Sequence, residues 1–129
     1  MKMRKALVVD DSKTIRIIIK RILVDIGYEV CEAGNGVEAL KVLDSEPLVK
    51  LVLADWNMPE MNGLDLVKAV RRMPDYDSLK VLMVTTETEI EQMCQALEAG
   101  ANEYVMKPFT KDILLEKLEL VGMLPAARV

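Results

Sequence analysis

The chain has 129 residues, of which 51% are hydrophobic and 29% charged, with a net charge of −4, and this balance indicates one globular domain with a single core. No basic stripe is interleaved with aromatic residues, which argues against direct nucleic-acid binding, and no apolar run approaches the roughly 18 residues of a membrane span. The chain contains no histidine, which excludes Ser-His and Cys-His catalysis, imidazole metal sites and a phosphohistidine on this protein.

Short apolar runs alternate five times with segments of helical period. The runs predict strands at residues 6–9, 28–33, 51–54, 81–84 and 103–106. Apolar spacing at i, i+3 and i+4 predicts helices that begin near Lys13, Asn35, Gly63, Thr88 and Thr110. Thr88 with Glu91 resembles a capping box, and Gly27 suits the left-handed residue that ends a helix.

The alternation of continuous apolar strands with helices predicts a parallel sheet covered by helices on both faces. Right-handed crossovers leave few topologies, and we predict the flavodoxin-like one: an α/β, doubly wound (βα)5 fold with a five-stranded parallel sheet in the order 2-1-3-4-5. A Rossmann fold is the weaker alternative, because the turn after the first strand reads Asp-Asp-Ser-Lys-Thr and has no glycine to admit a pyrophosphate.

The two cysteines and the first residues of the chain indicate the cellular compartment. Cys31 and Cys94 match no metal-ligand spacing, and we predict that each is a buried free thiol, with Cys94 on the apolar face of the fourth helix. The basic start at residues 1–5 is followed by an apolar run too short for a signal peptide. We therefore expect a reducing, cytoplasmic location.

Polar residues follow four of the predicted strands. In an open parallel sheet, ligands bind beyond the carboxyl ends of the strands, at the point where the strand order reverses. The residues predicted to meet at that edge are Asp10, Asp11, Asp55, Thr85 and Lys107. Each one alone is typical of a turn or a helix start, but four such endings at one edge indicate a site.

The residue types at this edge suit a metal-dependent phosphoryl transfer. Crowded carboxylates raise one another's pKa unless a cation neutralises them, and an all-oxygen ligand set favours Mg²⁺ or Mn²⁺. A carboxylate such as Asp55 can act as nucleophile and form an acyl phosphate. Lys107 could neutralise the equatorial oxygens and Thr85 could donate a hydrogen bond to them. The spacing after Asp55 excludes an EF-hand, and the chain has no P-loop.

Four motifs are specific in combination: Val-Val-Asp-Asp-Ser at 8–12, Asp-Trp-Asn-Met-Pro-Glu-Met-Asn-Gly at 55–63, Val-Leu-Met-Val-Thr-Thr-Glu at 81–87 and Tyr-Val-Met-Lys-Pro-Phe at 104–109. With them, the chain resembles a response-regulator receiver domain of the chemotaxis CheY type from Leu7 to about Gly122. The resemblance implies that Asp55 is the phosphorylated nucleophile. It also implies that Asp10 and Asp11 hold Mg²⁺ together with Asp55 and the backbone carbonyl of Asn57.

The resemblance further implies a conformational switch. Thr85 would move toward phosphorylated Asp55, Lys107 would contact the phosphoryl group beside a cis peptide to Pro108, and Tyr104 would follow from an outward to an inward rotamer. A Tyr104 that only covers the sheet edge fits the sequence equally well. Asn57 and Glu87 occupy the positions that tune hydrolysis of the acyl phosphate in this family, and their identities predict a short-lived phosphorylated form.

The implied partners are a sensor histidine kinase as phosphodonor, an effector or motor protein, and a phosphatase. The effector would bind a monomer through the face formed by the fourth helix, the fifth strand and the fifth helix. The fourth helix begins with the acidic run Thr88-Glu89-Ile90-Glu91, where the best-known motor-switch binder carries lysines. This departure argues against the flagellar switch as partner.

We predict a stand-alone phosphoacceptor switch of bacterial signalling, in chemotaxis, that catalyses only its own phosphorylation and dephosphorylation. Only residues 123–129 follow the last predicted helix, so we expect residues 1–129 to form a single receiver domain without an output domain. Two alternatives stay open: a phosphate sink or phosphorelay intermediate without its own effector, and a metal-dependent phosphohydrolase. The hydrolase is disfavoured because the second acid that it would need, two residues after Asp55, is Asn57. The complete acidic set disfavours a degenerate receiver that works without phosphorylation.

Overall fold

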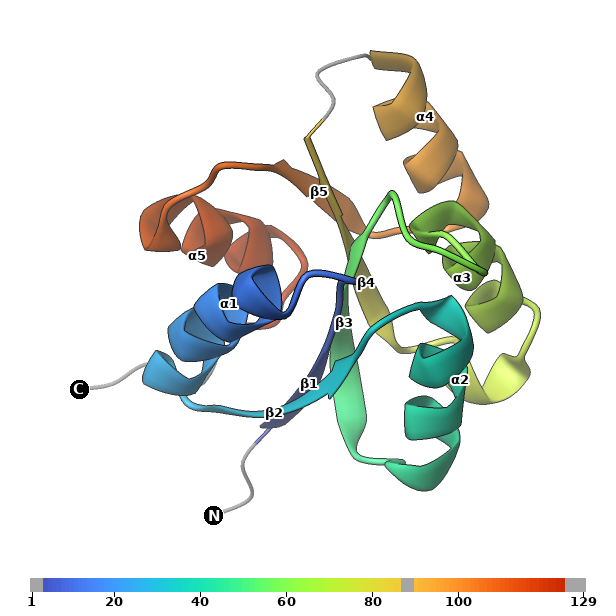
Figure 1. The fold of residues 1–129 in the computed structure, drawn as a ribbon, viewed down its shortest axis with the longest axis horizontal. Helices are drawn as coiled ribbons and strands as arrows, with labels where there is room; N and C mark the ends of the chain where they lie inside the picture. Colours follow the sequence, from blue (N-terminus) through green and yellow to red (C-terminus); the bar gives the residue numbers. More distant parts are fainter. Residues whose placement is uncertain (1–3, 87–89, 125–129) are drawn as a thin grey trace.

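The computed structural model describes residues 4–86 and 90–124 of the chain (Figure 1). The predicted helix cap Thr88 and the predicted tuning residue Glu87 lie outside these residues. None of the helices in the described part combines the length and the apolar character that a membrane-spanning helix needs.

The five strands form one parallel sheet in the order β2-β1-β3-β4-β5, which confirms the predicted flavodoxin-like topology. The strands are β1 (Arg4–Val9), β2 (Tyr28–Ala33), β3 (Val49–Asp55), β4 (Lys80–Thr85) and β5 (Glu103–Met106). The helices are α1 (Lys13–Asp25), α2 (Gly36–Ser45), α3 (Gly63–Arg71), α4 (Ile90–Ala99) and α5 (Lys111–Leu120), with a 3-10 turn η1 (Pro74–Tyr76) before β4.

Helices cover the sheet on both faces, with α1 and α5 on one side and α2, α3 and α4 on the other (Figure 1). Successive residues of a strand point to opposite faces. In β3, Leu51 and Leu53 therefore pack with α1 and α5, whereas Val52 and Ala54 pack with the other three helices. Both faces of the central strands are buried, which is why their sequences are continuous apolar runs.

Side-chain caps begin the helices that the sequence predicts. Ser12 caps α1, Asn35 caps α2, Asn62 caps α3 and Thr110 caps α5, each by accepting a hydrogen bond from a backbone N–H three residues later. These bonds satisfy donors that have no partner inside the helix. The caps fix where each helix leaves the carboxyl edge of the sheet.

Helix α4 differs from the prediction in the face that it buries. Ala96 is fully buried, and Cys94 and Leu97 are exposed. At 100° per residue, turning Ala96 to the core carries Cys94 to the far side of the helix. The predicted burial of Cys94 is therefore wrong, and Cys31 is only partly buried. Both thiols are free, as predicted.

Candidate functional site

The carboxyl ends of β1, β3, β4 and β5 lie at one edge of the sheet, because all the strands are parallel. The edge brings together the three acidic side chains that the sequence singled out. Asp10, Asp11 and Asp55 each offer a carboxylate oxygen, and the three oxygens lie within 4.8 Å of one another. Asp10 and Asp55 are buried, with 2% and 7% of their surface exposed, whereas Asp11 is exposed.

Lys107 reaches this cluster from the end of β5. Its Nζ lies 2.9 Å from Oδ2 of Asp10 and 3.4 Å from Oδ1 of Asp55. Burial disfavours the charged form of Lys107, but hydrogen bonds and charge attraction from Asp10 and Asp55 outweigh it, so the pKa of the ammonium is raised. One cation therefore serves two buried carboxylates, and Lys107 stays protonated at neutral pH.

The positive charge near Asp55 does not fully compensate the negative charge of its carboxylate. Burial raises the pKa of its carboxyl group first, and the negative charge of Asp10 raises it further, while Lys107 lowers it only in part. Three carboxylates with too little positive charge around them, and with oxygen atoms as the only ligands that they offer, suit a hard divalent cation. The residues present thus fit a Mg²⁺ site formed by Asp10, Asp11 and Asp55.

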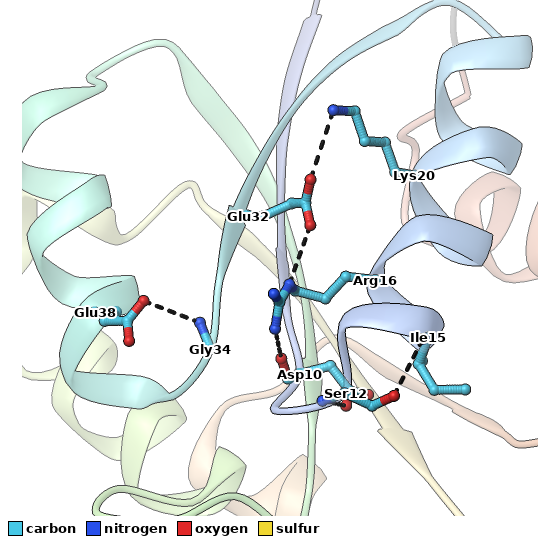
Figure 2. Close-up of polar contacts among 8 residues, drawn as sticks. All are labelled: Asp10, Ser12, Ile15, Arg16, Lys20, Glu32, Gly34 and Glu38. Atoms are coloured by element: carbon cyan, nitrogen blue, oxygen red, sulfur yellow. Dashed lines mark hydrogen bonds and ion pairs between the residues drawn. The ribbon is translucent and has the colours of Figure 1, made fainter.

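Asp10 is held by residues that the sequence analysis did not identify. Figure 2 shows that Arg16 of α1 donates through Nη1 to the carbonyl of Asp10 at 2.6 Å and through Nε to Glu32 of β2 at 3.0 Å. The backbone N–H of Ser12 donates to Oδ1 of Asp10 at 2.9 Å. The sequence shows Arg16 only as a single arginine in the run Ile15-Arg16-Ile17. Such a pattern is typical of a solvent-facing residue in an amphipathic helix, so it did not predict the contact with Asp10.

The loop after β3 is packed tightly under Asp55. A side chain on Gly63 would bring its Cβ within 2.3 Å of the carbonyl oxygen of Asp55, so only glycine fits there. Glu60 adopts a positive φ of 63° and accepts a hydrogen bond from the side chain of Asn35 at 3.0 Å. Asn57 lies exposed in this loop, two residues after Asp55. The loop geometry thus fixes the backbone that follows the candidate nucleophile.

The two predicted switch residues lie in β4 and β5, on the side of β3 away from β1. Thr85 is 3% exposed at the end of β4, its carbonyl accepts from the N–H of Lys107 at 2.7 Å, and its hydroxyl donates to Oε1 of Gln92 in α4 at 3.3 Å. Tyr104 is half-buried on β5, where Nζ of Lys117 lies 4.3 Å from the centre of its ring. The peptide between Lys107 and Pro108 is cis, as the resemblance implies.

Comparison with known proteins decides the family. A model of the response regulator receiver domain matches residues 6–119. The chain belongs to the response regulator receiver domain family. This receiver is 52% identical to chemotaxis protein CheY1 of Helicobacter pylori over 118 residues, which are 91% of this chain and 95% of that protein. It is also 52% identical to a chemotaxis protein CheY homolog of Campylobacter jejuni over 116 residues, 89% of each chain.

Solved structures of receivers have the same fold. The structure of Vibrio cholerae chemotaxis protein CheY4 superposes on this receiver with a TM-score of 0.87 at 40% sequence identity, over 93% of this chain and 99% of that one. A response regulator receiver domain protein from Methanospirillum hungatei superposes with a TM-score of 0.84 at 33% identity, over 95% of this chain and 97% of that one. The similarity therefore extends over nearly the whole domain.

Proposed function

We propose that this receiver accepts a phosphoryl group on Asp55 in a Mg²⁺-dependent reaction, with a sensor histidine kinase as donor. The observation that carries the proposal is the position of the Asp55 carboxylate. It lies at the carboxyl edge of the sheet, with oxygens of Asp10 and Asp11 within 4.8 Å and Nζ of Lys107 at 3.4 Å. An oxygen nucleophile, an acidic metal site and a fixed cation are the components that phosphoryl transfer needs.

In the proposed reaction, a carboxylate oxygen of Asp55 attacks phosphorus and forms a P–O bond. The bond from phosphorus to the donor breaks, and the donor leaves with the electron pair, as a carboxylate from an acyl phosphate or as an imidazole that takes up a proton. Lys107 neutralises charge on the transferred group, and Thr85 donates a hydrogen bond to it. Bound at Asp10, Asp11 and Asp55, with the Asn57 carbonyl as a further ligand, Mg²⁺ would offset the negative charge that the reacting groups bring together.

The output of this reaction is a change in partner binding. We propose that the partner binds the face formed by α4, β5 and α5. This face includes Gln92 of α4, Tyr104 of β5 and Lys117 of α5. Phosphorylation would draw Thr85 toward Asp55 and Tyr104 inward, and the switched face would bind an effector. The names of the H. pylori and C. jejuni relatives support chemotaxis as the pathway. A phosphatase would end the signal, and Asn57 and Glu87 would set its intrinsic lifetime.

We also propose that the receiver acts as a cytoplasmic, monomeric, single domain. The match to the curated relatives covers 95% and 89% of their own chains, so those proteins have little beyond a receiver. It would catalyse only its own phosphorylation and dephosphorylation. Asn57 stands where a hydrolase acting on external substrates would carry its second acid, which argues against turnover of phosphoesters.

The test uses the single tryptophan, Trp56, which is adjacent to Asp55 and buried. Beryllofluoride, a phosphoryl analogue, is titrated into the protein with Mg²⁺ or with EDTA while Trp56 fluorescence is recorded. We expect a saturable change that needs Mg²⁺ and that Asp55→Asn abolishes. Asp44→Asn, in α2, is the matched control and should respond like wild type. A change of equal size in Asp55→Asn would contradict the assignment.

A further inference from the structure

We infer that Gln92 of α4 is a positioning residue that latches the unphosphorylated state by holding the hydroxyl of Thr85. The inference rests on the proposed phosphoacceptor function and adds a regulatory residue to it. The hydroxyl of Thr85 donates to Oε1 of Gln92 at 3.3 Å, across the gap between β4 and the first turns of α4.

A hydroxyl group has one proton to donate. While that proton lies in the bond to Gln92, it is not available to an oxygen of a phosphoryl group on Asp55. Thr85 is 3% exposed and Gln92 is half-buried, so the bond is largely shielded from water. Moving Thr85 to the phosphoryl group therefore first breaks a shielded hydrogen bond, and the latch lowers affinity for that group.

The far end of α4 is fixed much more firmly. Arg71 donates through Nε to the carbonyl of Gly100 at 2.9 Å and through Nη2 to Oδ1 of Asn102 at 2.9 Å. The same Asn102 oxygen accepts from the backbone N–H of Val81 at 2.8 Å, which ties the segment after α4 to β4. Breaking the Gln92 bond would therefore release the first turns of α4 while its last turn stays anchored.

This arrangement couples chemistry at Asp55 to the proposed effector face through one side chain. Gln92 belongs to α4, and its side chain accepts a hydrogen bond from Thr85 of β4. Losing this bond therefore frees the hydroxyl of Thr85 and the first turns of α4 at the same time. The coupling is reciprocal. A partner that favours the released form of α4 would raise the affinity of the acidic site for a phosphoryl group.

The test compares equilibrium dissociation constants for beryllofluoride at saturating Mg²⁺, read from Trp56 fluorescence. Gln92→Met keeps the length of the side chain and removes the acceptor, and Gln92→Ala removes the side chain. We expect both to tighten binding about twofold to tenfold, the range that corresponds to one hydrogen bond. Gln95→Met, an exposed position on the same helix, is the matched control and should keep the wild-type constant.

A double-mutant cycle separates the latch from a general effect on α4. Thr85→Val keeps Asp55 and Lys107 and should bind more weakly than wild type. In that background, Gln92→Met should give no tightening, because the bond is already absent. Equal tightening with and without Thr85, or a wild-type constant in Gln92→Met, would overturn the latch while leaving the phosphoacceptor function intact. Wild-type protein without any Mg²⁺-dependent change would overturn both.

Discussion

The two edges of the sheet handle charge in opposite ways. At the carboxyl edge, three carboxylates lie within 4.8 Å of one another and share the ammonium group of Lys107. At the amino edge of β4 and β5, the single guanidinium of Arg71 donates to four oxygens, the carbonyls of Tyr76, Leu79 and Gly100 and the side chain of Asn102. The carboxyl edge therefore has three carboxylates around one ammonium group, whereas at the amino edge one guanidinium donates to four uncharged oxygens.

This difference indicates that the carboxyl edge contributes to cation binding and the amino edge to the stability of the fold. Under-neutralised carboxylates raise the free energy of the folded chain but give a strong site for a cation. A saturated guanidinium binds no ligand but joins α3, η1, β4 and the end of α4. This receiver therefore has its candidate site at one edge of the sheet and a network of anchoring hydrogen bonds at the other, and substitutions at the two edges should have effects of opposite sign.

The largest effect is expected at the amino edge. Arg71→Met removes the donor from three partly buried carbonyls, and we expect it to lower the free energy of unfolding by about 3 kcal/mol. Arg71 is half-buried, and this partial burial lowers the pKa of its guanidinium. Urea unfolding measures the change, with the neighbouring exposed Arg72→Met as control. Equal effects of the two substitutions would remove the contrast between the edges.

Mg²⁺ should stabilise the fold by neutralising the excess negative charge at the carboxyl edge. A ligand that binds only the folded state at a hundred times its dissociation constant adds about 2.7 kcal/mol to the free energy of unfolding. We expect this gain in urea unfolding of wild type when MgCl₂ is added, and a much smaller gain in Asp11→Asn. Asp112→Asn, in α5, should gain as much as wild type. A full gain in Asp11→Asn would place the cation elsewhere.

Without a divalent cation, removing one charge from the cluster should stabilise the fold. Asp55→Asn relieves the repulsion from Asp10 and the burial of an anion, and we expect a gain of about 1 kcal/mol in the free energy of unfolding at pH 7 with EDTA present. The measurement is urea unfolding beside Asp44→Asn, which should change little. Destabilisation by Asp55→Asn would mean that Lys107 already compensates the cluster.

The same gain should depend on pH. The pKa of Asp55 is raised in the folded state above its ordinary value of 3.8, so the folded protein holds this proton more tightly than the unfolded chain. The stability from that proton is fully present below the ordinary pKa and is lost as pH rises through the raised one. The advantage of Asp55→Asn should therefore grow as pH rises from about 4 to 7. An advantage that shrinks over this range would contradict the raised pKa.

The sequence predicts which residues come together where the ends of strands determine their positions. Asp10, Asp55, Thr85 and Lys107 each follow an apolar strand, and parallel strands carry such residues to one edge whatever the detailed packing. Arg16, Arg71 and Gln92 could not be found in this way. Each lies on a helix, where a long polar side chain reads as solvent-facing, and its role depends on which neighbour lies within reach in three dimensions.

The error at Cys94 has a related cause. The larger apolar residues of α4 predict a face that contains Cys94, and the small Ala96 gave little signal of its own. Ala96 packs in the buried cluster that also contains residues of the sheet and of α3, and Cys94, two positions earlier in the helix, is exposed. Helix rotation is set by this packing, which the period of the sequence alone does not determine.

The central claim is that the carboxylate of Asp55 receives the phosphoryl group. Its most direct test is to treat the protein with a small acyl-phosphate donor and Mg²⁺, reduce it with borohydride, and map the modified residue by peptide mass spectrometry, since reduction converts an aspartyl phosphate to homoserine. We predict homoserine at position 55 alone, lost when EDTA replaces Mg²⁺ and absent from Asp55→Asn. Homoserine at another aspartate, or labelling of position 55 that does not need Mg²⁺, would contradict the account.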